Sequence, residues 1–368
     1  MTREIIRLST DTGLRAWSDT LEKCGNHDVY HTAEYHLAAR DQGLGEPALL
    51  VVEEPEGLVA MPLLIRAINP ELTGESVQYD ATSVYGYGGP VTSVAAELSR
   101  QNSVTDRFGN EIVALMEELE LVSFFTRLHP LVDTAWVFNA IGKTRTVGPT
   151  VVIDLAEPAE VQQNNIRKGH RYSIKKALKS GVQVFEDPEW AQIREFEGAY
   201  QETMARVGAT DNYSFSHDSL MILHDRLGPK IKLFHAALDN QIIGSSIFFV
   251  CNDIIQYHLG ATYSEWTQLS PGTAILDYVR LWGAAQGLRW FHLGGGVEGN
   301  EDAVFRFKSG MSKLRRVYPS ASVIVDTEGY DLLCDARQKL IGPAGSPGDV
   351  QDFFPEYRAP LEFVDSQD

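Results

Sequence analysis

Three apolar segments of strand length, separated by tight turns, lie in the second half of this sequence and restrict what it can fold into. Turns this short join neighbouring antiparallel strands, so the three segments predict a sheet built from hairpins. The predicted strands cover residues 232–238, 242–250 and 254–260, with Asp239-Asn240 and Asn252-Asp253 as the turns.

A helix and one more strand follow these hairpins. Pro271 suits the first turn of a helix and Gly287 the position after its end, and residues 289–293 form a short apolar segment. A helical connection allows two strands of one sheet to run parallel. The pattern therefore predicts a mixed sheet in a fold of the α/β class.

Further elements are expected around this sheet. Gly181 is a good residue to end a helix, while Asp187 with Pro188, and later Ser216, are good residues to begin one. The predicted helices cover 160–180, 187–208, 216–228 and 302–309, and two late strands cover 315–318 and 322–325.

The first half repeats this plan more faintly. Its predicted strands cover 49–53, 58–66, 77–79 and 121–128, and a helix covers 105–120. The helix and strand before residue 130 are similar in pattern to those at 271–293, which favours a duplicated domain. We expect one domain over 1–150, a second over 151–330, and a tail over 331–368 whose Phe353, Phe354 and Tyr357 dock onto the body.

The overall charge excludes some classes of protein. The chain carries 50 acidic and 32 basic residues, a net charge of −18, which disfavours general binding to nucleic acids or anionic membranes.

Other features of the sequence bear on its location. No segment is long and apolar enough to span a membrane, and the N-terminal residues do not resemble a secretory leader. Three cysteines far apart do not suggest a disulfide framework. We expect a cytoplasmic protein.

One segment departs from this acidic balance. Residues 164–180 contain six Lys and Arg side chains and no acid. On a helix these side chains repel one another unless an anion lies nearby, so the segment is a candidate phosphate site, with an ordinary solvated helix face as the alternative. The predicted phosphate-binding or nucleic-acid-binding residues are Arg167, Lys168, Arg171, Lys175 and Lys176.

Two later segments are candidates for chemistry. Residues 270–273 open the long helix, where free N–H groups can hold an anion, although ordinary capping is the commoner role. Lys308, in the segment 305–310, can stabilise a developing oxyanion or a terminal phosphate, with a solvated lysine as the alternative. Between them, residues 294–299 formally match a dinucleotide-binding glycine pattern but are interpreted as a tight loop.

Motifs for metal and covalent chemistry are not found. The ten histidines show no metal-binding spacing, and no nucleophile elbow or phosphate-binding loop is present. We therefore expect no bound metal or cofactor, and either direct group transfer or plain binding.

Residues 164–184, 200–216 and 254–312 together resemble the Fem family, the aminoacyltransferases that build peptidoglycan bridges, and their acetyltransferase-like (GNAT) relatives. The similarity covers about residues 150–315 and extends loosely into the first half, to the segments 85–91 and 124–130. It implies two tandem GNAT-type domains that form amide bonds. An amine attacks the ester of an aminoacyl-tRNA, without a metal or a covalent enzyme intermediate.

The resemblance also implies roles for individual residues. Lys308 corresponds to the lysine near the reacting ester, and the basic helix would face the nucleic-acid backbone. Either Asp302 or His258 could assist proton removal. The residues expected to bind substrate are Arg206, Tyr213, Tyr257, Phe307 and Tyr85.

Three functions remain open from the sequence. The first is aminoacyl transfer from aminoacyl-tRNA onto the amine of a small molecule or peptide. The second is an acyl-CoA-dependent N-acyltransferase, although residues 270–273 match the glycine-rich signature of acyl-CoA enzymes only in part. The third is a non-catalytic binding protein on the same scaffold.

Overall fold

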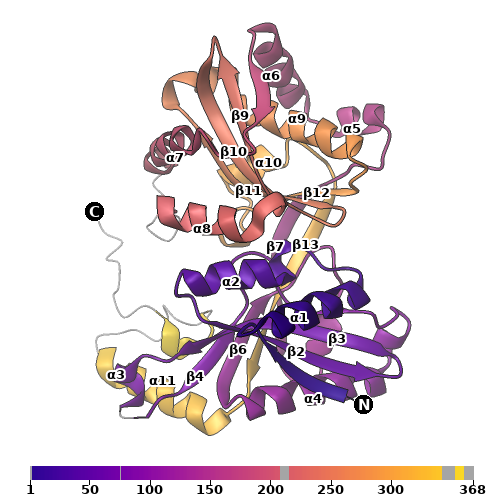
Figure 1. Ribbon diagram of the computed structural model, residues 1–368, viewed down its shortest axis with the longest axis vertical. Helices are drawn as coiled ribbons and strands as arrows, with labels where there is room; N and C mark the ends of the chain where they lie inside the picture. The colour runs from indigo at the N-terminus through magenta and orange to yellow at the C-terminus, as the bar shows by residue number, and fades with distance from the viewer. Residues whose placement is uncertain (1, 75, 208–214, 342–352, 360–368) are drawn as a thin grey trace. The chain divides into compact units, whose positions relative to one another are not determined.

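The computed structural model describes residues 2–74, 76–207, 215–341 and 353–359 (Figure 1). The chain divides into two compact units. Unit 1 comprises Met1–Thr146 and Pro319–Asp368, and unit 2 comprises Val147–Tyr318. The sheets are mixed and combine with helices in each unit, so the predicted α/β fold class is confirmed.

Unit 1 is built on a sheet with strand order β1-β2-β3-β4-β6-β13. Its strands pair antiparallel except β4 and β6, which run parallel and are separated in sequence by the long helix α4. The elements of unit 1 are β1 (Thr2–Arg7), α1 (Asp11–Cys24), α2 (Ala33–Asp41), β2 (Glu46–Glu54), β3 (Gly57–Ala67), α3 (Pro70–Thr73), β4 (Tyr79–Thr82), β5 (Val91–Thr92), α4 (Asn102–Glu118), β6 (Leu121–Arg127), the second half of β13 (Arg315–Ile324) and α11 (Thr327–Ile341).

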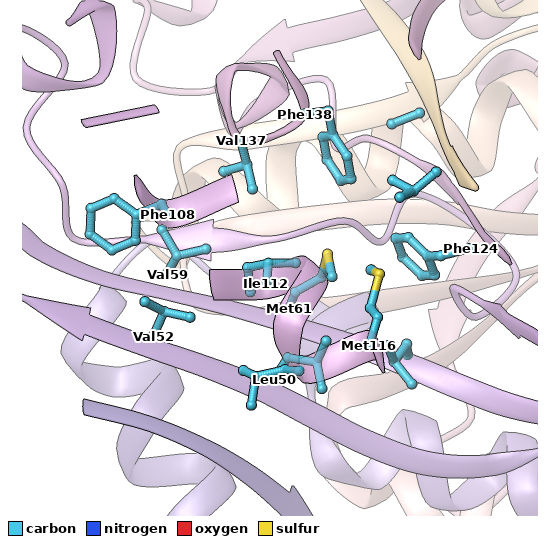
Figure 2. Packing of buried hydrophobic residues seen from close by; sticks show 14 of the residues in the cluster. Leu50, Val52, Val59, Met61, Phe108, Ile112, Met116, Phe124, Val137 and Phe138 are labelled. Carbon is cyan, nitrogen blue, oxygen red and sulfur yellow. The ribbon is translucent and has the colours of Figure 1, made fainter. Parts of the chain in front are cut away.

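The core of unit 1 lies between its sheet and α4. Apolar side chains recur on one face of α4, as expected for a helix packed on a sheet. Strands β2 and β3 are buried on both faces, and every second residue of each belongs to this cluster. Figure 2 shows these side chains meeting in one cluster. Phe124 stacks on Phe138, with ring centroids 6.5 Å apart. The labelled members are Leu50, Val52, Val59, Met61, Phe108, Ile112, Met116, Phe124, Val137 and Phe138.

Unit 2 repeats this plan with strand order β7-β12-β11-β10-β9-β8. Among the described strands of unit 2, β11 and β12 alone run parallel, and the helix α9 connects them. The predicted hairpins are present, with positive φ at Asp239, Asn240 and Asn252. The elements of unit 2 are β7 (Lys143–Asp154), α5 (Ala159–Asn165), α6 (Lys168–Lys179), β8 (Gln183–Glu186), α7 (Ile193–Val207), α8 (His217–Leu227), β9 (Ile231–Leu238), β10 (Gln241–Cys251), β11 (Ile254–Thr262), α9 (Pro271–Ala285), β12 (Trp290–Gly294) and α10 (Ala303–Lys308).

The two faces of the unit 2 sheet have different neighbours. On one face, α6 and α9 pack against a core that includes Phe248 and Phe291. On the other face, Phe215 connects Tyr200 of α7 with His258 of β11 through ring contacts of 6.2 and 5.6 Å. Neighbouring residues on one strand of this sheet therefore pack against different helices, one on each face of the sheet.

Four predicted elements differ from those observed. The helix expected over 160–180 is two helices, because Ile166 is extended and the N–H of Arg167 donates to the carbonyl of Gly310 at 2.8 Å. The helix expected from residue 187 begins at Ile193, since the Asp187 carboxylate accepts the N–H groups of 191 and 192 and holds a separate turn. The two late strands are one strand, β13.

The end of the chain also differs from the prediction. Residues 319–330, which were expected in the second domain, lie in unit 1, because the second half of β13 pairs antiparallel with β6. Tyr357 is buried, and Phe354 stacks on Tyr330 with ring centroids 5.8 Å apart. Phe353 was expected to dock as well but is 48% exposed.

Candidate active site

Lys308 lies at the C-terminal end of α10 and is directed at the glycine loop 294–299. Its ammonium donates a hydrogen bond to the carbonyl of Gly295 at 2.7 Å. The same nitrogen lies 5.8 Å from the centre of the Tyr257 ring, within the range of a cation–π contact. The lysine is half-buried, so it is held by specific partners and is not the solvated side chain that the sequence left as an alternative.

The surroundings of Lys308 change its acidity. Burial of the ammonium lowers the pKa of Lys308 from an ordinary 10.5 to about 8, although the nearby Asp302 carboxylate favours the charged form. A lysine with this pKa is mostly charged at pH 7 but can lose its proton more readily than a surface lysine. Such a group can donate a strong hydrogen bond to an oxygen that develops negative charge.

Tyr257 lies where two parallel strands separate. Strands β11 and β12 pair only from Ile254 to Gln256, opposite residues 290–292, and from Tyr257 onward β11 stays paired with β10 alone. The hydroxyl of Tyr257 hydrogen-bonds with buried Ser246, and burial raises the pKa of Tyr257 to about 12, so it stays protonated. A Cβ on Gly260 would overlap this hydroxyl, which explains the glycine there.

Phe307 connects this region with the start of α9. Its Cζ lies 3.8 Å from the position that a Cβ of Gly272 would occupy, so the ring lies beside the first turn of α9. The ring also lies 5.8 Å from that of His170. Lys308, Tyr257, Phe307 and the start of α9 are thus gathered at the separated ends of β11 and β12.

His258 is not brought together with Lys308. It packs on Phe249 at 4.3 Å and on Phe215, whereas its neighbour Tyr257 packs on Phe248 at 5.5 Å. The two residues therefore face opposite sides of the sheet. Burial lowers the pKa of His258 to about 3, which keeps it neutral at pH 7. This placement does not fit the proposed assistance to proton removal near Lys308.

Asp302 is close to Lys308 but is engaged with the backbone. One carboxylate oxygen accepts the N–H of Phe305 at 2.8 Å and caps α10, while the other accepts the N–H of Val297 at 3.1 Å. Both oxygens therefore have donors already. The geometry supports a structural role for this carboxylate in place of the base that the sequence suggested.

The start of the basic helix α6 is attached to α10. Besides the bond from Arg167 to Gly310, the Nε2 of His170 donates to the carbonyl of Phe307 at 2.9 Å. A Cβ on Gly310 would overlap the His170 ring. Sequence reasoning missed His170, since a single histidine in a basic segment has no distinctive spacing.

The five predicted phosphate-binding residues do not act alike. Arg171 donates to the carbonyl of Ile166 at 2.7 Å and so caps the end of α5, and Lys176 donates to the carbonyl of Gln268 at 2.9 Å. Arg167, Lys168, Lys175 and Lys176 are exposed, whereas Arg171 is partly buried. Four of the five predicted residues therefore lie on an exposed surface.

The remaining predicted substrate-binding residues lie in three places. Arg206 is exposed at the end of α7 and donates to the carbonyl of Thr262 at 3.3 Å and to the hydroxyl of Ser264 at 2.9 Å. Tyr213 lies outside the described residues. Tyr85 belongs to unit 1, is 50% exposed, and accepts the hydroxyl of Tyr35 on its carbonyl at 3.0 Å.

The described residues contain no group of three or more His, Cys, Asp or Glu side chains arranged to hold a metal ion. No helix among them has the length and apolar character needed to cross a membrane.

Residues 164–309 match the family model of the acetyltransferase (GNAT) domain. This range begins just before α6 and contains β8 to β12, α9 and Lys308. This part of the chain thus matches a GNAT-type acetyltransferase domain, as the resemblance predicted for these residues. No curated protein matches the chain with significant sequence similarity.

The fold of the chain is similar to that of FemX. The two chains are 11% identical with a TM-score of 0.68, over 89% of this chain and 99% of FemX. A second similar structure is L-PGS from Bacillus licheniformis, with 13% identity and a TM-score of 0.53 over 89% of this chain and 96% of that one. The C-terminal domain of a putative lysylphosphatidylglycerol synthetase from Agrobacterium fabrum has 11% identity and a TM-score of 0.53, over 84% and 91%. The predicted Fem-like and GNAT-like fold is confirmed.

Proposed function

We propose that this chain transfers an aminoacyl group from an aminoacyl-tRNA to the amine of a small molecule or peptide, forming an amide bond. The observation that carries the proposal is the attachment of α6 to α10. The hydrogen bonds from Arg167 to Gly310 and from His170 to Phe307 put the beginning of a basic helix next to the residue that precedes Lys308. A polyanionic carrier with a reactive ester at its end needs cationic contacts and an oxyanion donor close together.

The proposed reaction follows from the chemistry of esters and amines. A neutral amine attacks the ester carbonyl, a C–N bond forms, and the C–O bond to the ribose breaks. The proton lost by the nitrogen ends on the leaving ribose oxygen. Lys308 would stabilise the negative oxygen of the intermediate, with the protonated Tyr257 hydroxyl as a second donor nearby.

No side-chain base is assigned in this proposal. His258 lies on the other face of the sheet, and both oxygens of Asp302 accept backbone N–H groups. The proton can pass to the ribose oxygen through water or through the substrate itself. Holding ester and amine together would then supply most of the acceleration, on the order of several kcal/mol.

The similar structures support an aminoacyl group as the transferred unit. The name of the Agrobacterium fabrum domain, a putative lysylphosphatidylglycerol synthetase, denotes the joining of a lysyl group to another molecule. An acyl-CoA donor is the second candidate, because the family model that matches residues 164–309 is that of an acetyltransferase domain.

A donor comparison tests the proposal. The purified chain would be incubated with a panel of small amines and either mixed aminoacyl-tRNAs or acetyl-CoA, each with and without ribonuclease. We expect amide formation from aminoacyl-tRNA that ribonuclease abolishes and that declines steeply with salt. Turnover of acetyl-CoA that ignores ribonuclease would instead support the second candidate.

A further inference from the structure

The carboxylate of Asp302 joins two segments of unit 2 that meet at Lys308. Its Oδ1 accepts the N–H of Phe305 in the first turn of α10, and its Oδ2 accepts the N–H of Val297 in the glycine loop. Capping a helix needs only the first of these bonds. The second bond therefore has a separate consequence, which is to fix the loop against the helix.

That loop carries the carbonyl that holds the lysine. Gly295 accepts the ammonium of Lys308 at 2.7 Å and lies two residues before Val297. Gly296, between them, has no room for a side chain, because a Cβ there would overlap the Asn300 carbonyl and lie 2.5 Å from the Asp302 carboxylate. The glycine loop, the Asp302 carboxylate and the Lys308 ammonium are thus in contact with one another, so a shift of one would displace the others.

We propose that Asp302 is a positioning residue: by bonding Val297 and Phe305 together, it keeps the Gly295 carbonyl in place and so directs the Lys308 ammonium at the ester carbonyl. This inference rests on the proposed function for the reaction itself. Asp302 neither touches the substrate nor takes a proton. Its negative charge additionally favours the charged form of the lysine beside it.

Two substitutions separate bridging from capping. Asp302→Ser keeps an oxygen that caps α10 through Phe305, but its side chain is too short to reach Val297 as well. Asp302→Asn keeps the size of the side chain and one carbonyl oxygen, so it can accept only one of the two N–H groups. Both variants are expected to fold with a Tm near that of the wild type.

Kinetics supply the first readout. Because misplacement of a reacting group by about 1 Å is costly, both variants should lose between about tenfold and a hundredfold in kcat. The KM values for tRNA and amine should stay within about twofold, since no binding contact is removed. A Ser variant with the kcat of the wild type would show that Asp302 only caps the helix and would overturn the proposal.

Chemical labelling of Lys308 supplies a readout that needs no substrate. The folded protein would be treated briefly with acetic anhydride, and the modified fraction of the peptide containing Lys308 measured by mass spectrometry. Loss of one hydrogen bond to the ammonium should raise the labelling rate by about threefold or more in both variants. An unchanged rate overturns the positioning role, whether or not the chain proves to use aminoacyl-tRNA.

A matched control removes a helix cap elsewhere. Thr10 caps α1 in unit 1, where its hydroxyl accepts the N–H of Gly13 at 3.1 Å. Thr10→Ala should lower the unfolding free energy by about 1 kcal/mol without changing kcat or the labelling of Lys308. If this control reproduced the effects of the Asp302 variants, general destabilisation would explain them and the proposal would fail.

Discussion

The partial burial of Lys308 changes both its acidity and its direction. Lys308 is charged and half-buried, so it is kept by partners of three kinds: a carbonyl oxygen at 2.7 Å, an aromatic ring at 5.8 Å and the carboxylate of Asp302. Each partner compensates for part of the lost hydration. A surface lysine would be better hydrated but would also be less well directed.

The lowered pKa of Lys308 predicts how activity depends on pH. Because the proposed role needs the ammonium, kcat/KM should fall as the pH rises through about 8. An Arg in its place stays charged in this range, so whatever activity Lys308→Arg retains should lack that fall. A pH–rate profile of both proteins checks this, and a profile of the wild type that stays level to pH 10 would contradict the assignment.

The lowered pKa of Lys308 also predicts how the unfolding free energy depends on pH. Between pH 8 and 10.5 the folded lysine has lost its proton while the unfolded one has kept it, so the unfolded state binds more protons. The titration of Lys308 therefore makes the unfolding free energy of the protein rise with pH in that window. Denaturation series of wild type and Lys308→Met should diverge there.

At the scale of elements, the contact between α6 and α10 is central, because the proposed function needs the basic helix to lie beside Lys308. It consists of two hydrogen bonds and one close approach, that of Gly310 to the ring of His170. The approach is possible only without a side chain at residue 310.

Gly310→Ala is therefore expected to push α6 away from α10. The unfolding free energy should fall by about 1–3 kcal/mol, as in overpacked cores, and tRNA should bind more weakly. Gly169→Ala is the matched control, because no atom lies within 4 Å of its added Cβ and alanine favours a helix. Chemical denaturation measures the stability of both variants, and filter binding measures their affinity for tRNA. Equal tRNA affinity in the two variants would contradict a role of the contact between α6 and α10 in tRNA binding.

At the scale of the whole molecule, residues far apart in sequence complete unit 1. Arg358 and Tyr357, near the end of the chain, both bond to the buried carboxylate of Asp80, and Arg358 also donates to the carbonyl of Ala67 at 2.8 Å. Arg66 holds the same carboxylate from β3 at 3.0 Å. The C-terminal segment is thus part of the fold of this unit.

Removing one of these partners should destabilise unit 1. Arg358→Ala leaves Asp80 with Arg66 and Tyr357, so we expect a loss of about 1–3 kcal/mol in unfolding free energy. Lys339→Ala, an equal change of charge at an exposed position of α11, should be nearly neutral. Denaturant titrations of the two variants compare them directly, and equal midpoints would contradict the role of this segment.

Much of this architecture follows from local patterns in the sequence. The hairpins of unit 2, the start of α9 at Pro271 and the cap of α8 at Ser216 are set by turn and capping chemistry, which neighbouring residues reveal. The break at Ile166 and the passage of β13 into unit 1 depend on Gly310 and on β6, which are distant in sequence. Local patterns carry no signal for such contacts.

The candidate site divides in the same way. Lys308 and Tyr257 were found from their residue types and from the resemblance, and they lie together. The face to which His258 points depends on its packing against Phe249, and the engagement of Asp302 depends on a loop bond to Val297. His170 was missed because its partner, the carbonyl of Phe307, is a backbone atom of another element.

The most direct test of the central claim is single-turnover transfer from saturating aminoacyl-tRNA to an accepted amine, measured for the wild type and for Lys308→Met. Loss of one oxyanion donor should slow the step by about a hundredfold or more while tRNA affinity stays nearly unchanged. Equal transfer rates in the two proteins, or no transfer from any aminoacyl-tRNA while acetyl-CoA is used, would contradict the account.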